Sequence, residues 1–318
     1  MQERVDKRNP KIVVVGGGTG VFTVLSGLRK YPVELSAIVS MADDGGSTGV
    51  LREEFGILPP GDVRRVLVAM SHSERLLSDL FNYRFEEGGL RGHTFGIIML
   101  TALERLTGSF EEAVDEAAKI LRVKGRVFPV TLDNVRLCAE LEDGTLVRGE
   151  TNIDIPRHDG FLKIARIWLE PEAKLNTKAE SAIKNADMII VGPGDLYTSI
   201  VPNLLVRGMP EALKNSSSKK VYVVNLMTKW GETNGFTAAD FLSTLEKYLG
   251  KNVLNCIVIN NKRPSLVRTK QYEKENAKFI EAGNLPSKPV PVFGDYLRSR
   301  GFVRHDPDKL AKILVSLI

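Results

Sequence analysis

Short apolar runs alternate along this chain with longer segments in which apolar residues recur every three or four positions. The short runs predict buried strands and the longer segments predict amphipathic helices, so their alternation indicates β-α-β units and a parallel sheet. The predicted strands cover residues 11–15, 33–39, 186–191, 221–225, 253–259 and 290–293. The predicted helices cover residues 21–29, 74–84, 94–106, 110–122 and 307–318, and one more begins at a predicted N-cap residue, Asp62.

The middle of the chain has a different pattern. Short strand-like runs follow one another at residues 126–130, 136–142, 145–150 and 161–169. Asp143-Gly144 between two of them is a typical hairpin turn. We therefore predict an antiparallel β insert over residues 125–172, at the edge of the sheet and inside a single α/β domain that spans residues 1–318. Glycine and proline indicate irregular structure over residues 51–61.

Glycine-rich, polar loops follow three of the predicted strands. The first loop is Gly16–Gly20, the second is Asp43–Gly49 and the third is Gly192–Ser199. Such loops at the ends of parallel strands offer backbone N–H groups to a phosphate, and Thr198 and Ser199 add hydroxyl groups. Because loops at adjacent strand ends frame one crevice, we expect a nucleotide-type ligand.

The first loop departs from two common nucleotide-binding fingerprints. Val21 or Thr23 stands where the dinucleotide motif has its third glycine, and Val39-Ser40 stands where that motif has an acidic residue. No Gly-Lys-Ser/Thr follows the loop, as a P-loop would need. A dinucleotide-dependent enzyme is therefore disfavoured.

Asp43 and Asp44 lie side by side in the second loop. One interpretation is that a carboxylate caps its own turn, and the other is that it holds a sugar hydroxyl, a metal or a reacting proton. We name Asp44 as the functional candidate and the residue that could hold Mg²⁺, with Asp62 as a second catalytic candidate. His93 is interpreted as structural, because no Ser/His/Asp set and no zinc spacing can be assembled from the sequence.

Composition narrows the class of protein. The chain has 44 Lys and Arg against 39 Asp and Glu, a net charge of +5, and the two signs are interspersed. This predicts no nucleic-acid partner. Cys138 and Cys256 lie in apolar stretches and predict buried, reduced thiols. The polar start of the chain and the absence of a long apolar run predict a cytoplasmic protein without membrane insertion. A homodimer is the base-rate expectation for its assembly.

Several of these motifs together resemble the bacterial gluconeogenesis factors, the YvcK-like proteins of the CofD-like superfamily. The resemblance rests on Gly16–Gly20, Asp43–Gly49, Pro59–Arg65, Gly92–Gly96, Gly192–Ile200 and Arg304–Asp306. It implies a Rossmann-like three-layer α/β/α fold that binds a nucleotide sugar, UDP-N-acetylglucosamine. It also implies a role in cell morphogenesis and in partitioning cell-wall precursors on gluconeogenic carbon sources, with cell-wall synthesis or regulatory proteins as partners.

The resemblance also implies which residues lie near the ligand. Tyr272 and Arg304 fall in segments similar to those that hold the nucleotide sugar in the family. With the residues of the loops, the predicted ligand-binding set is Gly17, Gly18, Thr19, Gly20, Asp44, Gly46, Ser47, Thr48, Gly192, Gly194, Asp195, Thr198, Ser199, Asn225, Tyr272 and Arg304. The chain departs from the family pattern at Ile97, where relatives usually have Asn, and at Pro307, where relatives can carry Thr.

Two functional hypotheses remain open. The first is a regulatory protein that binds a nucleotide sugar without catalysis. The alternative is a CofD-like transferase of nucleotide-activated phospho- or sugar groups, in which Asp44 and Asp62 would hold Mg²⁺ or accept a proton. Fold alone does not decide between them.

Overall fold

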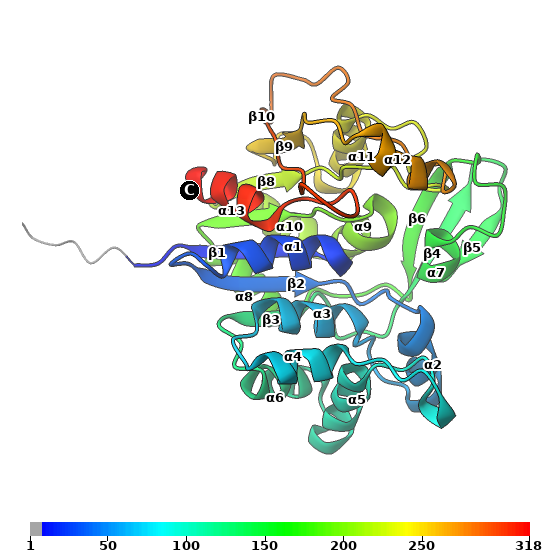
Figure 1. Cartoon of the computed structure of the whole chain (residues 1–318), viewed down its shortest axis with the longest axis vertical. Helices are drawn as coiled ribbons and strands as arrows, with labels where there is room; N and C mark the ends of the chain where they lie inside the picture. Colours follow the sequence, from blue (N-terminus) through cyan, green and yellow to red (C-terminus); the bar gives the residue numbers. More distant parts are fainter. Residues whose placement is uncertain (1–7) are drawn as a thin grey trace, which may run out of the picture.

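A seven-stranded parallel sheet forms the centre of the molecule, which a computed structural model describes over residues 8–318 (Figure 1). Its strand order is β10-β9-β8-β7-β1-β2-β3, and every neighbouring pair is parallel. The strands are β1 (Lys11–Gly16), β2 (Glu34–Val39), β3 (Arg126–Pro129), β7 (Met188–Val191), β8 (Lys219–Val223), β9 (Cys256–Asn260) and β10 (Val290–Gly294). The predicted α/β architecture with a mostly parallel sheet is confirmed.

Helices cover both faces of this sheet. On one face, α1 packs against α3 and α13, and on the other, α10 packs against α8 and α11. The larger helices are α1 (Gly18–Leu28), α2 (Gly46–Phe55), α3 (Gly61–Met70), α4 (Arg75–Asn82), α5 (Phe95–Thr107), α6 (Phe110–Ile120), α8 (Thr177–Lys184), α10 (Met209–Asn215), α11 (Ala238–Leu249), α12 (Leu266–Glu273) and α13 (Pro307–Ser316). Short helical turns are η1 (Gly88–Leu90), η2 (Leu196–Ile200) and α9 (Val201–Leu204).

The predicted central strands are buried because their side chains meet helices on both faces. Ile12 to Val15 in β1 and Met188 to Val191 in β7 are almost fully inaccessible to solvent. Both cysteines are buried and free, as the sequence predicts. No helix within residues 8–318 is long and apolar enough to cross a membrane.

The antiparallel insert is smaller than the expected range of 125–172. Its strands are β4 (Arg136–Leu141), β5 (Leu146–Arg148) and β6 (Ile164–Glu170), in the order β5-β4-β6. The first predicted strand of the insert is instead β3, which pairs in parallel with β2 and forms the edge of the main sheet. The insert and the short helix α7 (Glu150–Asp154) lie beyond the carboxyl ends of the main strands (Figure 1).

Two local expectations between β2 and α3 are wrong. Residues Gly46–Phe55 form helix α2, so only the segment from Gly56 to Pro60 is irregular. Helix α3 begins at Gly61 with Pro60 as its N-cap, so Asp62 lies in the first turn and is not the cap. Gly61 is required there, because a Cβ would lie 2.4 Å from Oδ2 of Asp43.

Candidate functional site

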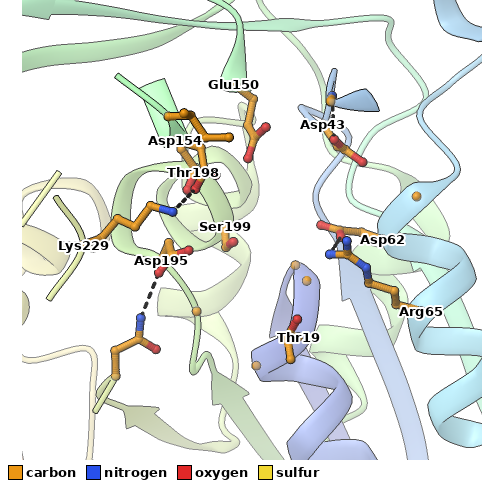
Figure 2. Close-up of a pocket in the computed structure, with 18 of the residues that line it drawn as sticks. Thr19, Asp43, Asp62, Arg65, Glu150, Asp154, Asp195, Thr198, Ser199 and Lys229 are labelled. Carbon is orange, nitrogen blue, oxygen red and sulfur yellow. Dashed lines mark hydrogen bonds and ion pairs between the residues drawn. The ribbon is translucent and has the colours of Figure 1, made fainter. Parts of the chain in front are cut away.

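A cleft of about 950 Å³ opens at the carboxyl ends of β1, β2, β7 and β8. Parts of all three glycine-rich loops line it, as the sequence predicts for a parallel sheet. Figure 2 shows the cleft with Thr19 at its floor. Asp43, Asp62 and Arg65 lie on one side, and Asp154, Asp195 and Lys229 lie on the other.

The first and third loops meet at the floor of the cleft. Gly17 is the N-cap of α1, and a Cβ on Gly20 would lie 2.0 Å from the carbonyl oxygen of Pro193. Gly18 has a φ of +65°, a conformation that favours glycine. The predicted residues of the two loops that line the cleft are Gly17, Gly18, Thr19, Gly20, Gly194, Asp195, Thr198 and Ser199. The helix start and the loop therefore present backbone groups to the same space.

Gly192, although predicted to contact the ligand, does not line the cleft. It is buried, and a Cβ there would lie 2.9 Å from Cδ1 of Ile200 and 3.0 Å from the carbonyl oxygen of Val223. Its role is to let the third loop turn closely against the end of β8.

The adjacent carboxylates of the second loop point in different directions. Asp43 lines the cleft and accepts a hydrogen bond from the Gly45 N–H at 2.9 Å. Asp44 does not line it, because its Oδ1 accepts a hydrogen bond from the N–H of Thr151 at 2.9 Å, in the first turn of α7. Asp43 therefore lines the cleft and Asp44 does not, and a ligand-binding or metal-binding role for Asp44 stays a prediction.

Asp62, in the first turn of α3, faces Asp43 of the second loop (Figure 2). It accepts hydrogen bonds from the Gly18 N–H and from Nη1 of Arg65, the latter at 3.3 Å. Burial, and then the negative charge of Asp43, raise the pKa of Asp62 to about 6. A divalent cation would relieve this repulsion, so the two carboxylates fit the oxygen ligands that Mg²⁺ prefers.

Helix α7 contributes two more carboxylates to the cleft. Burial and the nearby charges of Asp43 and Asp154 raise the pKa of Glu150 to about 9. Asp154 forms an ion pair with Lys229, with Oδ1 and Nζ 2.9 Å apart. These residues were not predicted from the sequence, because no recognisable motif surrounds them in the insert or in the loop after β8.

A second group of acidic side chains lies beneath the third loop. Asn225 Nδ2 donates to Oδ1 of Asp195 at 3.2 Å, while buried Glu232 accepts from the Tyr197 N–H and the Thr198 hydroxyl, each at 3.0 Å. Oxygens of Asp154, Asp195 and Glu232 all lie within 4.8 Å of one another. Burial, and then Asp195, raise the pKa of Glu232 to about 8. Glu232 thus fixes the backbone and hydroxyl of the third loop.

Tyr272 and Arg304 lie together on another part of the wall. The phenol oxygen of Tyr272 accepts a hydrogen bond from the Val303 N–H at 2.9 Å, next to the exposed Arg304. The Arg304 guanidinium carbon lies 5.3 Å from the centroid of the Phe302 ring. His305 is buried beside them, and burial lowers its pKa to about 4, so its imidazole is neutral at pH 7.

The remaining predicted residues line the cleft at the start of α2. Gly46, Ser47 and Thr48 lie there, and the Ser47 hydroxyl oxygen is 2.7 Å from Nδ1 of His93. Ile97, the position of the family departure, also lines the cleft. With backbone donors, carboxylates and arginines on its walls, the cleft can hold a phosphorylated, hydroxyl-rich ligand.

Comparison with known proteins identifies the family. The model of the CofD family, described as 2-phospho-L-lactate transferase CofD, matches residues 12–292. A protein from Nostoc sp. is 45% identical over 316 residues, which cover 97% of this chain and 68% of that relative. The gluconeogenesis factor of Bacillus subtilis is 42% identical over 319 residues, which cover 98% of this chain and 99% of that protein. A crystal structure of a UPF0052 family member from Bacillus halodurans matches with a TM-score of 0.90 and 39% identity, and the match covers 97% of this chain and 100% of that chain. The chain therefore belongs to the gluconeogenesis factor family of CofD-like proteins.

Proposed function

We propose that this protein is a cytoplasmic regulator that binds a nucleotide sugar, UDP-N-acetylglucosamine, in the cleft. The observation that carries the proposal is the meeting of the first and third loops at the cleft floor, where a Gly20 Cβ would lie 2.0 Å from the Pro193 carbonyl oxygen. Two sets of backbone groups at one position suit a diphosphate. The chain belongs to the gluconeogenesis factor family, and we further propose a role in cell morphogenesis and cell-wall precursor partitioning on gluconeogenic carbon sources.

The walls supply contacts for the rest of such a ligand. Arg304 can form a charge-assisted hydrogen bond to the diphosphate, and Tyr272 fixes the segment that carries Arg304. Asp195 and Asn225 offer an acceptor and donors to ribose or sugar hydroxyl groups. In this proposal the nucleotide sugar lies on the side of the cleft that is formed by the first loop, the third loop and Arg304.

A CofD-like transferase is the second candidate, and the pair of carboxylates Asp43 and Asp62 favours it. Both line the cleft beside the first loop, and the pKa of Asp62 is raised to about 6 by burial and by Asp43. If Mg²⁺ binds, Asp43 and Asp62 would hold it, and the ion would neutralise charge on the phosphates. Without the ion, Asp62 is suited to accept a proton near neutral pH.

Calorimetry with UDP-N-acetylglucosamine, NAD⁺ and GTP tests the leading proposal. We expect UDP-N-acetylglucosamine to bind more tightly than the other two, with little change when Mg²⁺ is replaced by a chelator. Equal or tighter binding of NAD⁺ would contradict the proposal. Binding that disappears in chelator, or a product formed over several turnovers and lost in Asp43→Asn, would favour the transferase.

A further inference from the structure

Helices α2 and α5 begin at the same corner of the cleft. Ser47 in the first turn of α2 and His93, two residues before α5, are joined by a contact of 2.7 Å between Oγ and Nδ1. Ile97 in the first turn of α5 packs against Leu51 of α2. We call this region the α2–α5 corner.

The first turns of both helices lack side-chain caps. Gly45 caps α2 without a side chain, and the hydroxyl of Thr94, the N-cap of α5, accepts no hydrogen bond from that helix. The Thr94 hydroxyl has no hydrogen-bond partner within residues 8–318 although the residue is only 2% exposed. The partial positive charges of two helix N-termini therefore act on one small region.

Arginine side chains add full positive charge to the α2–α5 corner. Arg64, Arg65 and Arg84 all line the cleft. The stem of Arg64 packs at the start of α5, since a Cβ on Gly96 would lie 2.9 Å from its Cδ. Asp62 neutralises Arg65 through their 3.3 Å ion pair, but neither Arg64 nor Arg84 forms an ion pair in the described part of the chain.

Arg64 carries an unsatisfied donor at this corner. The residue is only 7% exposed, and its Nη1 donates to Oδ1 of Asn82 at 2.5 Å. Its Nε has no hydrogen-bond partner among residues 8–318. A buried guanidinium with a free N–H and two cationic neighbours calls for an anion.

We propose that the α2–α5 corner binds the phosphate group of a second small ligand, separate from the nucleotide sugar. Two helix N-termini and two arginines without carboxylate partners match the charge of a phosphate monoester better than that of a single carboxylate. The corner is formed by segments that lie between β2 and β3 in the chain, whereas Arg304 lies between β10 and α13, so the two sets of side chains come from different segments of the cleft wall. That this ligand is additional to another one rests on the proposed nucleotide-sugar site.

This assignment gives Gly46, Ser47 and Thr48 a role that differs from the expectation in the sequence. They lie at the start of α2 and so face the second ligand, whereas the sequence-based prediction placed them on the nucleotide sugar. The cleft then holds two ligands, and Asp43 and Asp62 line the same cleft. That arrangement suits a protein that responds to two metabolites.

Inorganic phosphate is the probe for this proposal. Phosphate is titrated by calorimetry into the full-length protein at constant ionic strength, with chloride as the salt control, in the absence and presence of saturating UDP-N-acetylglucosamine. We expect phosphate to bind in both conditions. We expect Arg84→Gln, an exposed change that removes no ion pair, to raise the Kd for phosphate by about tenfold or more.

Arg91→Gln is the matched control, because Arg91 is exposed on the same segment and does not line the cleft. It should leave the Kd for phosphate unchanged. Phosphate binding that UDP-N-acetylglucosamine abolishes, or that Arg84→Gln and Arg91→Gln affect equally, would overturn the proposal, as would no phosphate binding at all. If UDP-N-acetylglucosamine does not bind but the phosphate result holds, only the proposed nucleotide-sugar function fails.

Discussion

The carboxylate of Asp44 accepts a hydrogen bond from the backbone N–H of Thr151, 2.9 Å away and 107 residues further along the chain. This contact ties the second loop to the first turn of α7, the helix that brings Glu150 and Asp154 into the cleft. A free helix N–H is satisfied by an acidic side chain from a distant segment. Asp44 therefore acts on the site by holding one of its walls.

Asp44→Ala should lower the free energy of unfolding by about 1–2 kcal/mol, the usual cost of losing a helix N-terminal acceptor. Urea unfolding followed by circular dichroism measures this loss. Glu172→Ala is the control, because Glu172 is exposed and near the insert, and it should leave stability unchanged. An Asp44→Ala variant as stable as the unchanged protein would show that the contact with Thr151 contributes nothing.

Gly20→Ala should destabilise the protein because the new methyl group has no room. Its Cβ would lie 2.0 Å from the Pro193 carbonyl oxygen, which is backbone and cannot rotate away. We expect a loss of at least about 2 kcal/mol, in the range measured for overpacked sites. Thermal unfolding should show a lower Tm, together with weaker binding of UDP-N-acetylglucosamine, because α1 and the third loop are pushed apart.

Gly89→Ala is the matched control for this substitution. Gly89 lies in the exposed turn η1, and a Cβ there would meet nothing within 4 Å. The Tm of the Gly89→Ala variant should stay close to that of the unchanged protein. Equal Tm values for Gly20→Ala and Gly89→Ala would mean that the first and third loops are not in close contact.

The raised pKa values in the cleft predict that stability falls as pH rises. Burial raises the pKa of Glu150 to about 9, so the folded protein keeps a proton that the unfolded chain releases near its usual pKa of about 4.3. The folded state therefore binds more protons between these two values, and the free energy of unfolding decreases across that window. The stabilisation is fully present below the lower value and is lost by about pH 9.

Glu150→Gln should weaken this pH dependence, because the amide carries no titrating proton. The measurement is urea unfolding at a series of pH values through the window, compared with Glu172→Gln, whose side chain is exposed. Glu150→Gln should show the shallower decrease, while Glu172→Gln should follow the unchanged protein. Part of the decrease in the free energy of unfolding with pH should remain in both variants, because burial also raises the pKa values of Glu232 and Asp62.

Much of the fold could be predicted because the central strands are continuous apolar runs. Ile12 to Val15 and Met188 to Val191 are buried on both faces, and such runs are visible in the sequence. Helix α2 could not be predicted so easily, because Gly46-Ser47-Thr48-Gly49 at its start has the composition of a loop. We predicted β3 as part of the antiparallel insert because it lies next to the insert strands in the sequence. Its parallel pairing with β2 spans the long segment that contains helices α2 to α6, and no local pattern indicates such a pairing.

The site was predictable where a loop follows a strand and unpredictable where distant segments meet. The first and third loops lie in the cleft because strand ends converge in a parallel sheet. The choice between Asp43 and Asp44 depends on Thr151, whose position no local pattern reveals. Glu150, Lys229 and Arg84 enter the cleft from the insert and from connecting loops, and only the tertiary structure brings them there.

The pair formed by Tyr272 and Arg304 gives a graded test of the proposed nucleotide-sugar site. Tyr272→Phe removes the acceptor of the Val303 N–H but keeps the ring, so Arg304 is held less firmly. We expect this change to raise the Kd for UDP-N-acetylglucosamine by about fivefold, the value of one neutral hydrogen bond, and Arg304→Gln to raise it by more than about tenfold.

Calorimetry on the two single variants and on the double variant checks this ordering. If Tyr272 acts through Arg304, the double variant should bind about as weakly as Arg304→Gln alone, because the effects of coupled residues do not add. Arg300→Gln, an exposed change outside the cleft, should bind like the unchanged protein. Fully additive losses would show that Tyr272 contacts the nucleotide sugar independently, and unchanged binding in Arg304→Gln would remove Arg304 from the site.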